Sequence, residues 1–300
     1  MWTTRIKNNL PFIAKRACSL TAAIYAFIGF LGAFVSLEGV FSSKDTFWYK
    51  LLISILILLG IWGLTALFIC LYVLLKKKKK VVDGMNGHAV YVIYGDLFDE
   101  KILGNNSERR NLCFAVNRCF DTIVDDEIVA KTTIHGKAFN KLYVDGTYTP
   151  DSLNTNIQNK LEVGNVHFMN LTTSDKRRGN LKRYDVGTTV DLRISDSLHY
   201  FMVGMSTYDR NLTANTTLLD FDISIQKLID FCNEQSQGYP VIMPILGGGL
   251  SRTSVNEKEL LDYIISAFKL NTRNINFDVY IVIRESAKGT ISIADLLKNI

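Results

Sequence analysis

Residues 239–252 read YPVIMPILGGGLSR, an apolar run that ends in three glycines and is followed by a basic residue. Such a short, continuous apolar run is typical of a strand buried on both faces of a sheet. Residues 256–270 continue with amphipathic helical spacing, and Ser254 or Asn256 is a suitable N-cap. A buried strand, a glycine-rich turn and a helix form the unit from which α/β domains are built.

Segments of the same kind surround this unit in residues 81–300. The patterns predict strands at 88–94, 111–116, 188–194, 200–206 and 277–283, and helices at 125–143, 218–237 and 293–300. Residues 81–87 are expected to be a linker, and residues 151–183 to hold a helix, a short strand and a loop. The alternation predicts a three-layer α/β/α domain with a mixed, largely parallel sheet.

Two long apolar runs, residues 17–40 and 47–75, precede this domain. Each exceeds the roughly 20 residues that a helix needs to cross a hydrocarbon core of about 30 Å. Residues 42–46 separate them, so residues 1–80 are predicted to form a transmembrane hairpin. A cleaved signal peptide is the competing interpretation of the first run, but the run is long for one and a second span follows at once.

The charge is divided between the two parts. Residues 1–80 carry eleven Lys and Arg against two Asp and Glu, a net +9, whereas residues 81–300 carry 23 against 27, a net −4. The cationic residues that flank the hairpin are Arg5, Lys7, Lys15, Arg16 and Lys76 to Lys80. Cytoplasmic flanks carry such an excess, so both termini are expected on the cytoplasmic side of the inner (plasma) membrane. The lysines favour anionic lipid, and the acidic balance of the soluble part argues against nucleic-acid binding.

Five cysteines are present, Cys18 and Cys70 in the apolar runs and Cys113, Cys119 and Cys232 in the soluble part. None forms a CxxC pair, and no His stands at ligand spacing beside them. We therefore expect buried free thiols in a reducing compartment and no metal site.

Polar or glycine-rich residues follow three of the predicted strands. Asp96, in Gly95-Asp96-Leu97, could accept a hydrogen bond from an adenine amino group, or could be an ordinary turn or cap residue. The glycines of residues 247–249 would let the backbone approach a phosphate, helped by a helix N-terminus and by Arg252. Many strand-to-helix turns need glycine for conformation alone, and no Walker or Rossmann motif is present.

The third strand end reads VNRCFD over residues 116–121. Asn117 could bond ribose hydroxyls and Phe120 could stack on a base, or the two could be an ordinary loop and a core aromatic. His135 could contact a diphosphate or a distal ribose, or be buried on the face of the predicted helix 125–143.

Together these motifs resemble a macro domain, the ADP-ribose-binding module, over roughly residues 90–295. Gly95-Asp96-Leu97 is similar to its adenine-recognising Gly-Asp-Ile turn, Asn117 falls where the family has a ribose-side Asn, and residues 247–252 resemble its second phosphate loop. Residues 116–122 and 184–188 resemble a bacterial variety of the domain. The ligand site implied by the motifs comprises Gly95, Asp96, Leu97, Asn117, Cys119, Phe120, Asp121, His135, Gly136, Leu246, Gly247, Gly248, Gly249, Leu250, Ser251 and Arg252.

Two transmembrane helices ahead of such a domain resemble the membrane effectors of type II Thoeris antiphage systems. That resemblance implies a free ADP-ribose derivative as ligand, such as histidine-ADP-ribose made from NAD by a TIR-domain partner. It implies no cofactor and no catalytic residue, and it implies homo-oligomeric assembly and damage to the membrane.

The chain departs from hydrolytic macro domains, which carry paired Asn and a long glycine-rich first loop. Here Asn117 stands alone, and His135-Gly136 is the nearest candidate for that loop. Binding without turnover is therefore expected. The alternatives are a membrane-tethered ADP-ribosyl hydrolase, with Asp121 as its carboxylate, and a scaffold that binds ADP-ribosylated partners.

Overall fold

The computed structural model describes residues 2–32, 47–103, 109–248, 255–294 and 296. These residues form two compact units, one of residues 1–77 with 288–300 and the other of residues 78–287. The last three lysines of the basic run belong to the second unit, and residues 288–294 belong to the first.

The first unit contains α1 (Trp2–Gly32) and α2 (Phe47–Leu75), both long and apolar enough to cross a membrane. The first helix begins well before the predicted start at residue 17, and residues 33–40 of the predicted span lie outside the described residues. Polar contacts join the two helices: the Thr21 and Thr65 hydroxyls lie 2.9 Å apart, and Arg5 donates to the carbonyls of Val73 and Leu74. These contacts satisfy polar groups that lipid could not.

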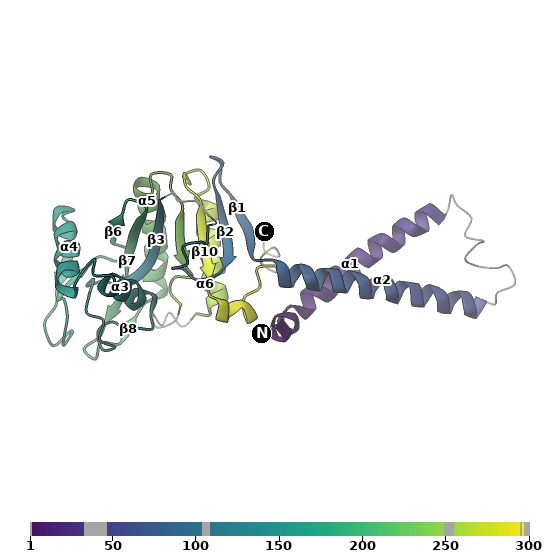
Figure 1. The fold of residues 1–300 in the computed structure, drawn as a ribbon, viewed down its shortest axis with the longest axis horizontal. Coiled ribbons are helices and arrows are strands. Elements are labelled where there is room, and N and C mark those ends of the chain that lie inside the picture. Colours follow the sequence, from purple (N-terminus) through teal and green to yellow (C-terminus); the bar gives the residue numbers. More distant parts are fainter. Residues whose placement is uncertain (1, 33–46, 104–108, 249–254, 295, 297–300) are drawn as a thin grey trace. The chain divides into compact units, whose positions relative to one another are not determined.

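The second unit is built on an eight-stranded sheet in the order β1-β2-β10-β9-β3-β7-β6, with β8 beside β7 (Figure 1). Its strands are β1 (Lys78–Asp83), β2 (Ala89–Tyr94), β3 (Arg110–Asn117), β6 (Thr189–Ser195), β7 (Leu198–Tyr208), β8 (Ala214–Asn215), β9 (Val241–Pro244) and β10 (Val279–Ile283). The central five strands are parallel, and β1 and β6 add antiparallel edges. The predicted mixed, largely parallel sheet is therefore confirmed. A separate pair, β4 (Phe168–Asn170) and β5 (Lys182–Tyr184), lies off this sheet.

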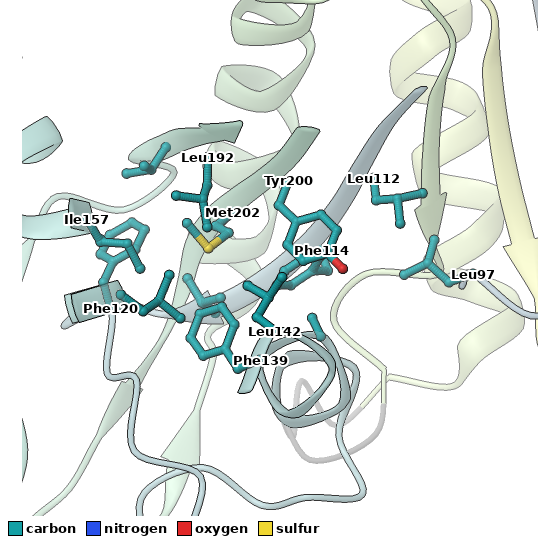
Figure 2. Packing of buried hydrophobic residues seen from close by; sticks show 14 of the residues in the cluster. Leu97, Leu112, Phe114, Phe120, Phe139, Leu142, Ile157, Leu192, Tyr200 and Met202 are labelled. Carbon is teal, nitrogen blue, oxygen red and sulfur yellow. The ribbon is translucent and has the colours of Figure 1, made fainter. Parts of the chain in front are cut away.

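Helices cover both faces of the sheet, as predicted. They are α3 (Ile134–Val144), α4 (Pro150–Val163), α5 (Leu218–Gln235) and α6 (Glu257–Leu270), and a 3₁₀ turn, η2 (Glu285–Gly289), follows β10. On one face, Phe114, Tyr200 and Met202 pack with residues of α3 and α4 (Figure 2). The alternation of strand side chains turns Phe201 to the other face, where its ring meets that of Phe231 on α5 at 5.2 Å.

The predicted linker at residues 81–87 is wrong in its first half, which belongs to β1. Val81 and Val82 are buried, and the strand pairs with β2 across a bulge between Lys80 and Val82. Burial of these two valines therefore stabilises a strand here, although the residues around them in the sequence are polar.

The predicted helix at residues 125–143 begins only at Ile134. The Asp125 side chain accepts hydrogen bonds from the backbone N–H groups of Glu127 and Ile128 at 3.0 and 2.8 Å. Such local bonds compete with the helix, and Thr133 caps the helix where it does begin. The predicted closing helix at 293–300 falls largely outside the described residues.

Candidate functional site

A cavity of about 500 Å³ lies at the carboxyl ends of β3, β7, β9 and β10. Residues 126–135, which lead into α3, form another part of its wall. The volume falls in the range of small-molecule sites, and the carboxyl ends of parallel strands are where α/β folds bind ligands.

Asn117 ends β3 and lines this cavity, with 2% of its surface exposed. Its Oδ1 accepts from the N–H of Cys119 at 3.0 Å and so holds a tight turn in which Phe120 takes a φ of 52°. The amide approaches the Asp121 carboxylate and the Tyr208 hydroxyl, but Nδ2 makes no hydrogen bond of good geometry with any described residue. A buried donor left unpaired costs about 1–3 kcal/mol. A ligand atom that accepts a hydrogen bond from Asn117 Nδ2 would remove this cost and so would bind more tightly.

His135 is the second residue of α3 and also lines the cavity. Its ring meets Phe139 edge-on at 4.5 Å and bonds the backbone of Asp121, whereas Nε2 has no partner among the described residues. Burial lowers the pKa of His135 to about 3, so the imidazole is neutral. With Nδ1–H donating to the Asp121 carbonyl, Nε2 is left as an acceptor, which suits a ligand hydroxyl better than a phosphate oxygen.

The glycine-rich loop after β9 contributes Leu246, Gly247 and Gly248 to the cavity wall. Gly247 has a φ of 78°, a conformation that glycine adopts without steric cost. At Gly248 a Cβ would stand 3.3 Å from Oε1 of Glu257, so the loop and the start of α6 are in close contact. The remaining predicted residues of this loop, Gly249, Leu250, Ser251 and Arg252, lie outside the described residues.

The structure does not place Gly95, Asp96 and Leu97 in the cavity wall, although they follow β2 at the same edge of the sheet. Leu97 belongs to the buried core cluster. Asp96 is exposed, and its Oδ1 accepts from the N–H of Phe98 at 3.0 Å. This is the geometry of an ordinary turn residue, the alternative to adenine recognition at Asp96.

Four other predicted site residues, Cys119, Phe120, Asp121 and Gly136, also lie away from the cavity wall. Phe120 is 1% exposed and packs edge-on against Tyr184 at 5.8 Å, so it is a core aromatic rather than a stacking surface for a base. Burial raises the pKa of Cys119 to about 11, which keeps it a thiol. A Cβ at Gly136 would clash with the carbonyl of Ala130, which explains glycine there by packing alone.

Asp121 is buried and paired with Lys176, whose Nζ lies 2.6 Å from Oδ2. Burial raises the pKa of Asp121, and the lysine opposes that shift. Lys176 is the first of three consecutive basic residues, and the next two form ion pairs: Arg177 pairs with Glu127 and Arg178 with Asp125. These pairs hold the 125–127 segment that forms one wall of the cavity.

Glu257 and Arg284 line the cavity but were not predicted. Arg284 directly follows β10, and its Nη2 lies 2.7 Å from Oε1 of Glu257 at the start of α6. The rule that polar residues after parallel strands gather at one edge, applied to the apolar run 277–283, would have found Arg284.

Comparison with known proteins identifies the domain. Residues 90–284 match the family described as Thoeris protein ThsA, Macro domain. The chain is 27% identical over 245 residues to Thoeris protein ThsA of Bacillus amyloliquefaciens (strain Y2), covering 79% of this chain and 73% of that protein.

Solved structures similar to this chain include the macrodomain of Mycobacterium tuberculosis DarG, with 17% identity, 64% of this chain and 96% of that one covered, and a TM-score of 0.39. The Oceanobacillus iheyensis macrodomain with ADP is 8% identical, with 71% and 92% covered and a TM-score of 0.38.

Proposed function

Since the chain belongs to the Thoeris ThsA macro-domain family, we propose that it is a membrane-anchored effector of antiphage defence that binds an ADP-ribose-derived signal. The observation that carries the proposal is the pair of unpartnered polar atoms, Asn117 Nδ2 and His135 Nε2, on two residues that line one cavity beside a glycine-rich loop. A nucleotide with a diphosphate and a distal ribose fits these groups.

The chemistry of the two side chains matches a sugar. Asn117 offers a donor and neutral His135 offers an acceptor, and a ribose hydroxyl can both accept and donate. The backbone at Gly247 and Gly248 can approach a diphosphate closely. The proposed ligand is accordingly an ADP-ribose derivative, such as histidine-ADP-ribose made by a TIR-domain partner.

The apolar helices α1 and α2 supply the membrane anchor, with both termini in the cytoplasm as the basic flanks favour. Residues 17–32 of α1 and the whole of α2 offer few polar side chains for a water-filled pore, so several hairpins must assemble to breach the membrane. A ligand drives such a change only if it binds one state more tightly than the other. We propose that the signal binds the assembled, membrane-disrupting state best.

Asp121 argues against the hydrolase alternative, because its carboxylate is buried in an ion pair with Lys176 and does not line the cavity. The scaffold alternative differs in its ligand, since a scaffold holds ADP-ribosyl groups attached to a protein.

The test is calorimetric titration of the full-length chain in detergent with ADP-ribose, histidine-ADP-ribose, NAD and AMP. The proposal expects tight binding of one ADP-ribose derivative, with the ligand recovered unchanged. Gly248→Glu, which adds a carboxylate beside Glu257, is expected to abolish that binding without unfolding the domain. Turnover of the ligand would support the hydrolase, and no binding to any of the four would refute the sensor.

A further inference from the structure

The charge of the cavity wall is unfavourable for a nucleotide. The acidic residues among its described lining are Asp126, Glu127 and Glu257, and the single described lysine or arginine is Arg284. A diphosphate carries about two negative charges near neutral pH, so a cation near its oxygens would add to the backbone N–H groups of the glycine-rich loop. Glu127 is already paired with arginines of the 176–178 run. Arg284 is therefore the cation that the described wall offers.

Arg284 is paired with a carboxylate. Its Nη2 lies 2.7 Å from Oε1 of Glu257, which is three-quarters buried and packs against Gly248. Glu257 is also the first residue of α6, where the helix dipole favours a negative group. The Glu257 carboxylate thus stands beside the glycine-rich loop, where the proposed function places a phosphate.

We propose that Glu257 is an electrostatic gate, which holds Arg284 until a phosphate of the ligand displaces it. A carboxylate and a phosphate are both anions that accept hydrogen bonds from a guanidinium, so Glu257 and a phosphate compete for Arg284. The gate rests on the proposed function and deepens it, because it makes Arg284 a recognition residue and Glu257 a brake on binding. Ligands without a phosphate cannot replace Glu257 at Arg284, so their affinity does not depend on this ion pair.

The test compares three variants of the full-length chain in detergent, titrated with ADP-ribose. Glu257→Gln keeps the size of the side chain but removes its charge, and Arg284→Gln removes the cation. Glu259→Gln is the matched control, since Glu259 is also in the first turn of α6 but does not line the cavity. Adenosine, which has no phosphate, serves as the control ligand.

Removal of the gate should tighten binding of ADP-ribose about 2- to 5-fold in Glu257→Gln, because Arg284 is 64% exposed and solvent screens its pair with Glu257. Arg284→Gln should weaken binding at least as much and flatten its dependence on salt, while Glu259→Gln binds like the wild type. Adenosine binding should be the same in all four proteins.

Two outcomes are informative against the gate. The gate is overturned, and the sensor is left intact, if Glu257→Gln binds ADP-ribose with wild-type affinity or with lower affinity. Failure of the wild type itself to bind ADP-ribose or its histidine derivative overturns the sensor and the gate together.

Discussion

The ammonium group of Lys176 lies 2.6 Å from Oδ2 of Asp121, and neither side chain is more than 2% exposed. The backbone N–H of Asn180 donates to the other Asp121 oxygen at 2.7 Å. The pair joins the 172–180 loop to the turn that follows β3, 55 residues earlier in the chain. Because that turn begins at Asn117, the buried pair fixes one wall of the site.

Lys176→Ala should therefore lower the free energy of unfolding of the domain by about 3–5 kcal/mol, since it leaves a buried carboxylate unpaired. The measurement is pulse proteolysis of the full-length chain in urea. Lys182→Ala is the control, because Lys182 pairs with Glu162 at the surface and should cost under about 1 kcal/mol. An equal decrease in the free energy of unfolding for the two variants would show that the buried pair stabilises the domain no more than the surface pair does.

His135 should make stability depend on pH. Its pKa is lowered from 6.5 to about 3 in the folded domain, so below pH 6.5 the unfolded chain binds a proton that the folded domain does not. The contribution of the neutral His135 ring to the free energy of unfolding is fully present above pH 6.5. It falls as the pH decreases toward 3, by up to about 1.4 kcal/mol per pH unit. His135→Gln should remove this part of the slope in urea titrations at pH 4 to 8. The exposed His167 is the control, and a slope unchanged in His135→Gln would contradict the buried neutral ring.

Asn117→Asp should lower the affinity for ADP-ribose about 10-fold or more, because it removes the Nδ2 donor and adds a charge near the diphosphate. The substitution keeps the oxygen that accepts from Cys119 N–H but places a second carboxylate beside buried Asp121, so unfolding in urea is measured alongside binding to check that the turn is kept. Asn170→Asp, on the exposed strand β4, provides the control for added charge. If calorimetry gives Asn117→Asp the affinity of the wild type, Asn117 does not bind the ligand.

Asp96→Ala tests the adenine end of the site. If Asp96 accepts from the adenine amino group, its loss weakens ADP-ribose binding by about 1–3 kcal/mol and leaves ribose 5-phosphate binding unchanged. Asp99→Ala is the matched control, since Asp99 holds a similar turn through the N–H of Lys101. Equal effects of the two variants would indicate that Asp96 acts only in its turn.

Most of the sheet could be predicted from the sequence, because its central strands are continuous apolar runs bounded by glycine and polar residues. Residues 277–283 contain β10, and the glycines after residue 246 mark the loop that follows β9. The resemblance to a macro domain was confirmed over residues 90–284. Local patterns of this kind depend on neighbours in the sequence, so they can be read without a structure.

The relationships that form the site could not be read in the same way. Nothing local shows that Phe120 turns into the core or that Asp121 pairs with Lys176. Glu257 and Arg284 meet only because β9 and β10 are neighbours in the sheet and α6 begins beside their carboxyl ends. Pairings between distant segments follow from the fold, and the sequence motifs mark only the strand ends where they occur.

Dye release from liposomes tests the central claim most directly. The full-length chain would be reconstituted into vesicles that contain anionic lipid, and histidine-ADP-ribose and ADP-ribose would be added to the face that carries the soluble domain. The account predicts rapid release that depends on one of these ligands and is absent in Gly248→Glu. Tight binding of the ligand with no release from the vesicles would contradict the claim that this domain controls a membrane-disrupting hairpin.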